Sequence, residues 1–186
     1  MKKTFWLLSV GVLLMTGCSD NQKQIKPSST PSLIKREETL TLGVKFKQAV
    51  YFQNRRKYNK AIEIYDSIIN DYHEKEDKSI LSSIYINKFE CSLLINRAYR
   101  EQDMNDFLRR FGNNERDMMA FEVLYILARA KGKSMDGKVE EWASKYRNYR
   151  LDGWTFVYID DWINQIEHTQ IRKRLNRYVS IFKKYL

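Results

Sequence analysis

Apolar residues recur at the three- and four-residue spacing of an α-helix from Leu40 to Leu186, and no strand-like alternation persists. Both prolines of the chain precede Leu40, so no proline interrupts a helix in this region. The pattern predicts an all-α domain, residues 40–186, of eight helices in four antiparallel pairs. We expect the helices at residues 40–55, 58–72, 77–99, 103–111, 115–131, 137–148, 153–167 and 170–185.

The second helix of each predicted pair contains a similar aromatic segment. The steps from Tyr65 to Phe107, to Trp142 and to Phe182 are 42, 35 and 40 residues. Such a quasi-periodic array of helix pairs is typical of an α-solenoid, in which each pair covers the apolar face of its neighbour. An irregular helical bundle is the alternative arrangement of the same helices.

The first pair resembles a tetratricopeptide repeat. In "RRKYNKAIEIYDSIINDY", Tyr58, Ala61 and Tyr65 have the family's spacing, and Ala49 occupies the small position of the first helix. The third pair repeats this pattern loosely, and the other two share only the helix layout. The resemblance implies a groove that binds a partner, and the charged clamp of peptide-binding relatives is absent from it. Its candidate contacts are Phe46, Val50 and Gln53.

The N-terminus has the layout of a secretory signal. Lys2 and Lys3 precede an apolar run from Phe5 to Met15, which is shorter than the ~20 residues of a membrane-spanning helix. The following "MTGC" resembles the lipobox of bacterial lipoproteins, which implies cleavage of residues 1–17 and lipidation of Cys18. An ordinary cleaved signal is the alternative.

Residues 18–39 contain both prolines and almost no apolar periodicity, so we expect a lipidated cysteine followed by a flexible tether. Ser19 follows the anchor. By resemblance to the sorting of enterobacterial lipoproteins, this residue implies a location on the periplasmic face of the outer membrane.

The net charge and the absence of catalytic motifs limit the functions that the sequence suggests. The chain has 33 basic and 23 acidic residues, and removal of Lys2 and Lys3 leaves a net charge of +8. This balance suits an acidic partner, a phosphate-bearing surface or the carboxylates of peptidoglycan, whereas the export signal argues against nucleic acid. The two histidines lack partners at metal-ligand spacing, and no phosphate-binding loop or nucleophile motif occurs. We therefore expect no enzyme, no metal and no cofactor.

Two helices carry candidate partner-binding side chains. Trp154, Tyr158 and Trp162 form an aromatic stripe beside an apolar one, so they are either buried or anchors in an exposed groove. The last helix has a basic side, which serves either as a polar cap of the solenoid or as a binding rim. Its candidate contacts are Arg172, Lys173 and Arg177.

These features together predict a lipid-anchored periplasmic adaptor for an envelope machine of secretion, pilus or outer-membrane assembly. The alternative is an immunity lipoprotein that neutralises a toxin delivered into the periplasm. Both functions consist of binding a protein, and the membrane contact is made by the N-terminal lipid.

Cys18→Ala should abolish anchoring, because this variant has no thiol to accept the diacylglycerol. The variant should be soluble in the periplasm or accumulate as an uncleaved precursor. Membrane fractionation after labelling with palmitate measures this, and label incorporated equally into the variant would contradict lipidation at Cys18.

Overall fold

The computed structural model describes residues 32–72, 78–151 and 153–186, and these are the described residues below. They fold into eight α-helices and a final 3-10 turn, without a strand among them, so the predicted all-α class is confirmed. The leader, Cys18 and the first part of the tether lie outside this region. The elements are α1 (Ser32–Asn54), α2 (Tyr58–Tyr72), α3 (Lys78–Leu94), α4 (Glu101–Phe111), α5 (Glu115–Ala130), α6 (Asp136–Lys145), α7 (Val157–Asn164), α8 (Thr169–Phe182) and η1 (Lys183–Tyr185).

Two helix starts differ from the sequence prediction by four residues or more, and α3 ends at Leu94 where the prediction extended it to residue 99. Helix α1 begins at Ser32, inside the segment expected to be tether, because no proline after Pro31 interrupts its backbone hydrogen bonds. Helix α7 begins only at Val157. The chain before it turns at Gly153, which has a φ of 75°, and the Trp154 amide donates to the Leu151 carbonyl at 3.2 Å. Glycine adopts this left-handed φ readily, and because it lies outside the helical region, the helix begins after Gly153.

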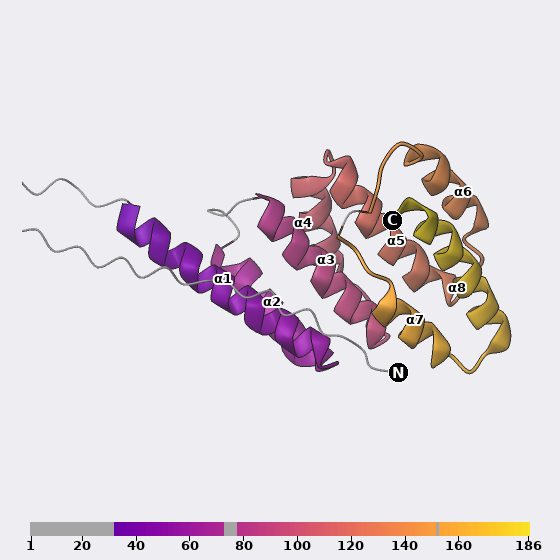
Figure 1. Cartoon of the computed structure of the whole chain (residues 1–186), viewed down its shortest axis with the longest axis horizontal. Helices are drawn as coiled ribbons and strands as arrows, with labels where there is room; N and C mark the ends of the chain where they lie inside the picture. The colour runs from indigo at the N-terminus through magenta and orange to yellow at the C-terminus, as the bar shows by residue number, and fades with distance from the viewer. Residues whose placement is uncertain (1–31, 73–77, 152) are drawn as a thin grey trace, which may run out of the picture.

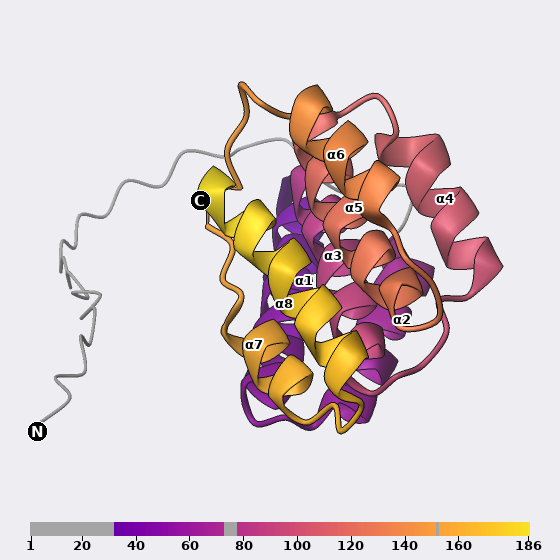
Figure 2. The same ribbon diagram turned by 90° about the vertical axis from the view of Figure 1, so that its right-hand side faces the viewer.

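The longer helices follow one another across the domain in chain order. Helices α1 and α2 lie side by side at one end, α3 packs on α2, α5 on α3, and α8 on α5 (Figure 1). In the view of Figure 2, α8 faces the viewer with α6 on one side and α7 on the other. The short helix α4 packs on α3. The pairs are therefore unequal, and the arrangement is consistent with both a solenoid and a helical bundle.

Aromatic side chains fill the interior. Tyr65, Phe107, Trp142 and Phe182, the four residues that mark the repeat in the sequence, are all fully buried. The ring of Phe107 lies 4.9 Å from that of Phe121 between centroids. Ala49 and Ala61 are also fully buried, which lets α1 and α2 approach closely, as the repeat pattern indicates.

The C-terminal end is tied back onto the preceding helices. The Leu151 amide donates to the Tyr185 carbonyl at 2.7 Å, and the Tyr185 hydroxyl donates to the Ala143 carbonyl at 2.8 Å. The Tyr178 hydroxyl accepts from the Met135 amide at 2.9 Å. Within the described residues, no helix combines the length and the apolar character needed to cross a membrane.

A buried ion network joins α2, α3 and α4. The Lys88 side chain is 4% exposed, and its ammonium lies 2.5 Å from an oxygen of Asp66 and 2.6 Å from one of Asp103. Arg100 contacts the same two carboxylates at 2.8 and 2.9 Å. Burial alone would raise the pKa of Asp103, but the hydrogen bonds from Arg100 and Lys88 outweigh it and hold the pKa below its ordinary value.

Lys88→Met should lower the free energy of unfolding by about 1.5–3 kcal/mol, because Asp66 and Asp103 lose their buried cation and keep only the more exposed Arg100. The matched control is Lys183→Met, which breaks an exposed pair with Asp160 and should cost less than about 1 kcal/mol. Urea denaturation of both variants at pH 7 measures the difference. Equal, small losses in the two variants would show that the Lys88 network does not stabilise the fold.

Candidate functional site

A cleft of about 310 Å³ opens between α1, α3, the first turns of α5 and the segment that leads into α7. We call it the α1–α7 cleft. Asn114 caps α5 beside it by accepting hydrogen bonds from the amides of Arg116 and Asp117 at 3.1 and 3.3 Å, which fixes the first turn of α5. The cleft is lined by Val50, Gln53, Asn54, Ser82, Ser83, Ile86, Asn87, Glu90, Arg116, Asp117, Ala120, Gly153, Trp154, Thr155 and Tyr158.

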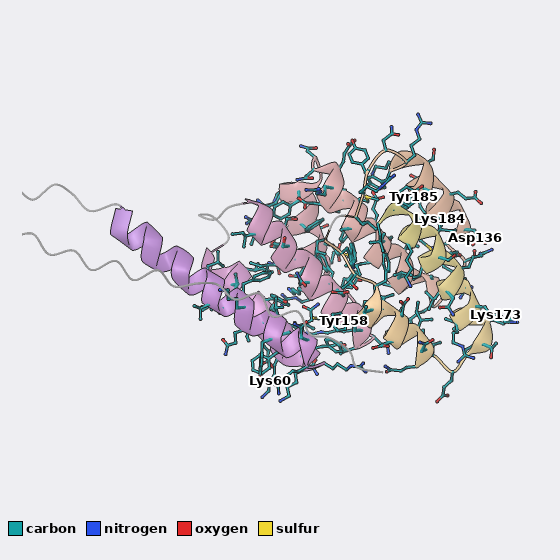
Figure 3. The ribbon with its side chains drawn as sticks, viewed as in Figure 1. Lys60, Asp136, Tyr158, Lys173, Lys184 and Tyr185 are labelled. Carbon is teal, nitrogen blue, oxygen red and sulfur yellow. The ribbon has the colours of Figure 1, made fainter. Side chains whose placement is uncertain are left out.

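The cleft brings together two sets of residues that the sequence predicted separately. Val50 and Gln53, from the first repeat, lie opposite Trp154 and Tyr158, from the aromatic stripe. The Tyr158 hydroxyl donates to the Asn54 side chain at 2.6 Å, so α7 is held against the end of α1 (Figure 3). Val50, Trp154 and Tyr158 therefore share one site and keep exposed surface there, whereas Gln53 lines the same cleft but is only 3% exposed.

Two further candidates do not line the cleft. Phe46 is half-buried, and its ring packs 6.3 Å from that of Tyr65. Trp162 is only 4% exposed, and its indole N–H donates to the Asn96 side chain at 3.2 Å. The aromatic stripe is thus divided, because Trp154 and Tyr158 line the cleft whereas Trp162 belongs to the core.

The basic candidates of α8 lie away from the cleft. Lys173 is exposed near the end of the domain opposite α1, far from Tyr158 (Figure 3). Arg177 pairs with Asp136, and Arg172 is half-buried. The structure therefore does not bring these residues together with the aromatic anchors, and one of their charges is already neutralised.

Glu90 lies in the wall of the cleft and was not recognised from the sequence. It is 7% exposed, and its Oε2 accepts a hydrogen bond from the Gln53 side-chain amide at 2.8 Å. Gln53 is itself held by the Tyr65 hydroxyl, which donates to its Oε1 at 2.8 Å. The second oxygen of Glu90, Oε1, has no hydrogen-bond partner among the described residues.

Burial raises the pKa of Glu90 to about 7, although the hydrogen bond from Gln53 acts in the opposite direction. The neighbouring Cys91 thiol is fully buried, and burial raises its pKa well above the ordinary value. Cys91 is therefore an inert thiol, as its apolar sequence neighbours indicate. Glu90, in contrast, changes its charge near neutral pH.

A sequence signal for Glu90 did exist. In "KFECSLLI" it lies four residues after Ile86 and three before Leu93, so it shares a helical face with apolar residues. A glutamate on such a face is either exposed to solvent or buried with a structural or binding role. Hydrophobic periodicity alone does not distinguish these cases. The burial of Glu90 depends on α1 and α7, which lie far from it in the sequence.

The described residues contain no cluster of three or more histidine, cysteine, aspartate or glutamate side chains that could hold a metal ion. The cleft offers aromatic surface, side-chain amides, hydroxyls, the charged side chains of Arg116 and Asp117, and the buried carboxyl of Glu90. Comparisons with protein-family models, curated proteins and solved structures find no match to this chain.

Glu90→Gln should stabilise the protein relative to the wild type, and more so as the pH rises from about 4.5 to about 7. In this range native Glu90 keeps its proton while the unfolded chain releases it, so the free energy of unfolding of the wild type falls with pH. The advantage of the variant should grow by about 3 kcal/mol and then remain constant. Urea denaturation between pH 4.5 and 8 measures it.

The control for this titration is Glu140→Gln, which changes an exposed glutamate. Its stability relative to the wild type should not vary over the same pH range. A constant difference for Glu90→Gln as well would show that Glu90 does not titrate near neutral pH.

Proposed function

We propose that this protein is a lipid-anchored periplasmic adaptor that holds a segment of a partner protein in the α1–α7 cleft. The main support is that side chains about 100 residues apart in the sequence form one cleft, and that two aromatic residues line it. Trp154 and Tyr158 are half-buried, so each keeps surface for a partner. Aromatic anchors bury area at a low entropic cost, which is why they dominate many interfaces.

Polar side chains complete the cleft in a way that suits a peptide. Asn54 and Asn87 carry amides that both donate and accept, and Thr155 carries an exposed hydroxyl. Such groups pair with the backbone N–H and C=O of an extended segment, while the rings contact its side chains. Binding of this kind needs no catalytic group, in agreement with an adaptor.

The remaining parts of the proposal come from the N-terminal sequence. "MTGC" supports a lipid on Cys18, and Ser19 supports the outer membrane as the place of attachment. On a membrane-bound protein the exposed cation of Lys173 would act at a distance, by speeding the approach of an acidic partner. The cleft would then make the specific contact.

A benzophenone amino acid at Thr155, on the exposed lip of the cleft, should cross-link to one partner in intact cells. The same group at Tyr149, an exposed aromatic position outside the cleft, should not. Mass spectrometry identifies the adduct: a component of an envelope machine supports the adaptor, and a secreted toxin supports the immunity alternative. Equal adducts from both positions would contradict a role for the cleft.

Tyr158→Ala should remove the Thr155 adduct, because loss of a central anchor typically costs about 2 kcal/mol of binding free energy. The melting temperature should fall little, since Tyr158 is only half-buried. Trp162→Ala is the matched variant for burial and should destabilise the domain by about 3–5 kcal/mol. An unchanged adduct in Tyr158→Ala would exclude this residue as an anchor.

A further inference from the structure

We propose that the α1–α7 cleft selects a partner segment that carries a lysine, whose ammonium binds Oε1 of Glu90. This inference rests on the proposed function and names the chemistry of the partner at the same site. The observation behind it is that Oε1 of Glu90 has no hydrogen-bond partner in the part of the chain that the structure describes, whereas Oε2 accepts a hydrogen bond from Gln53.

Glu90 lines the cleft with one of its two carboxyl oxygens unpaired within the described ranges. Gln53 holds Oε2 of Glu90 at 2.8 Å, and Tyr65 holds Gln53 at 2.8 Å, so the carboxyl is fixed from α1 and α2. Oε1 is buried and has no hydrogen-bond partner among the described residues. A buried polar atom without a partner costs free energy, and a ligand that supplies a donor recovers it.

Comparison with Asp103 indicates that the missing donor is a cation. Both carboxylates are 7% exposed. Asp103 contacts two cations, Lys88 and Arg100, and its pKa is lowered. Glu90 forms no ion pair within the described part of the chain, and its pKa is raised to about 7. A ligand ammonium would give Glu90 the kind of partner that Lys88 gives Asp103.

A lysine fits this acceptor better than an arginine does. The arginine guanidinium prefers two oxygens of one carboxylate, but Oε2 of Glu90 is already occupied by Gln53. A single ammonium needs only Oε1. The methylene stem of lysine also needs apolar contacts, and Val50, Ile86 and Trp154 supply them in the same cleft.

Binding should depend on pH, because Glu90 must lose its proton to pair with the ammonium. Burial raises the pKa of the neighbouring phenols of Tyr58, Tyr65, Tyr99 and Tyr158 and of the Cys91 thiol, so these groups keep their protons near neutral pH. The charged side chains of Arg116 and Asp117, on α5, line the same cleft. Affinity for the ammonium should therefore fall tenfold or more between pH 8 and pH 5.

The test uses the full chain in zwitterionic detergent micelles, with ¹⁵N-labelled tryptophan and ¹³C-labelled glutamate carboxyls. The probes are Nα-acetyl-lysine N-methylamide and the corresponding norleucine and arginine compounds. The lysine compound should shift the Trp154 indole signal and lower the pKa of Glu90. Norleucine, which lacks the ammonium, should do neither, and arginine should bind more weakly than lysine.

Glu90→Gln should abolish the response to the lysine compound and its pH dependence while the variant keeps a cooperative melting curve. The control Glu140→Gln should respond as the wild type does. An equal response to norleucine, a response that survives in Glu90→Gln, or no response between pH 6 and 8 would overturn the inference.

The two proposals fail separately. If the lysine compound gives no response but the Tyr158-dependent cross-link at Thr155 persists, the lysine site is rejected and the adaptor function stands. If the lysine compound gives the expected response but the cross-link is absent, the adaptor function is rejected and the lysine site stands.

Discussion

The ammonium of Lys88, enclosed between α2, α3 and α4, determines how α3 is turned within the domain. Its removal from water is unfavourable unless Asp66 and Asp103 stay within hydrogen-bond distance, which they do at 2.5 and 2.6 Å. Glu90 follows two residues later, about 200° further around the helix. The rotation that directs Lys88 toward α2 and α4 therefore directs Glu90 toward α1 and α7, where the cleft forms.

The fold class and the core could be predicted from the sequence because both follow from the helical spacing of the apolar residues. The aromatic series from Tyr65 to Phe182 is buried at every step, and six of the eight helices begin within two residues of their expected starts. The boundaries of α1 and α7 were harder to predict. They depend on local backbone features, the chain after Pro31 and the φ of Gly153, which hydrophobic spacing does not report.

The candidate site was predictable only in pieces. Spacing placed Trp154, Tyr158 and Trp162 on one stripe, but whether each ring is covered depends on α1 and on the loop after α3, at Asn54 and Asn96. Those contacts join residues 104 and 66 positions apart. Net charge was a similarly incomplete guide, since part of the positive charge is used within the domain, as in the pairs of Lys88 and Arg177.

The hydrogen bond between Tyr158 and Asn54 has a consequence for the order in which the molecule is assembled. Helices α1, α2 and α3 are neighbours in the chain, so their contacts close short loops, whereas α7 must cross about 100 residues to reach α1. In a chain that emerges with its N-terminus first, the first three helices are available before α7. The α1–α7 cleft is therefore complete only after the chain up to Tyr158 has emerged.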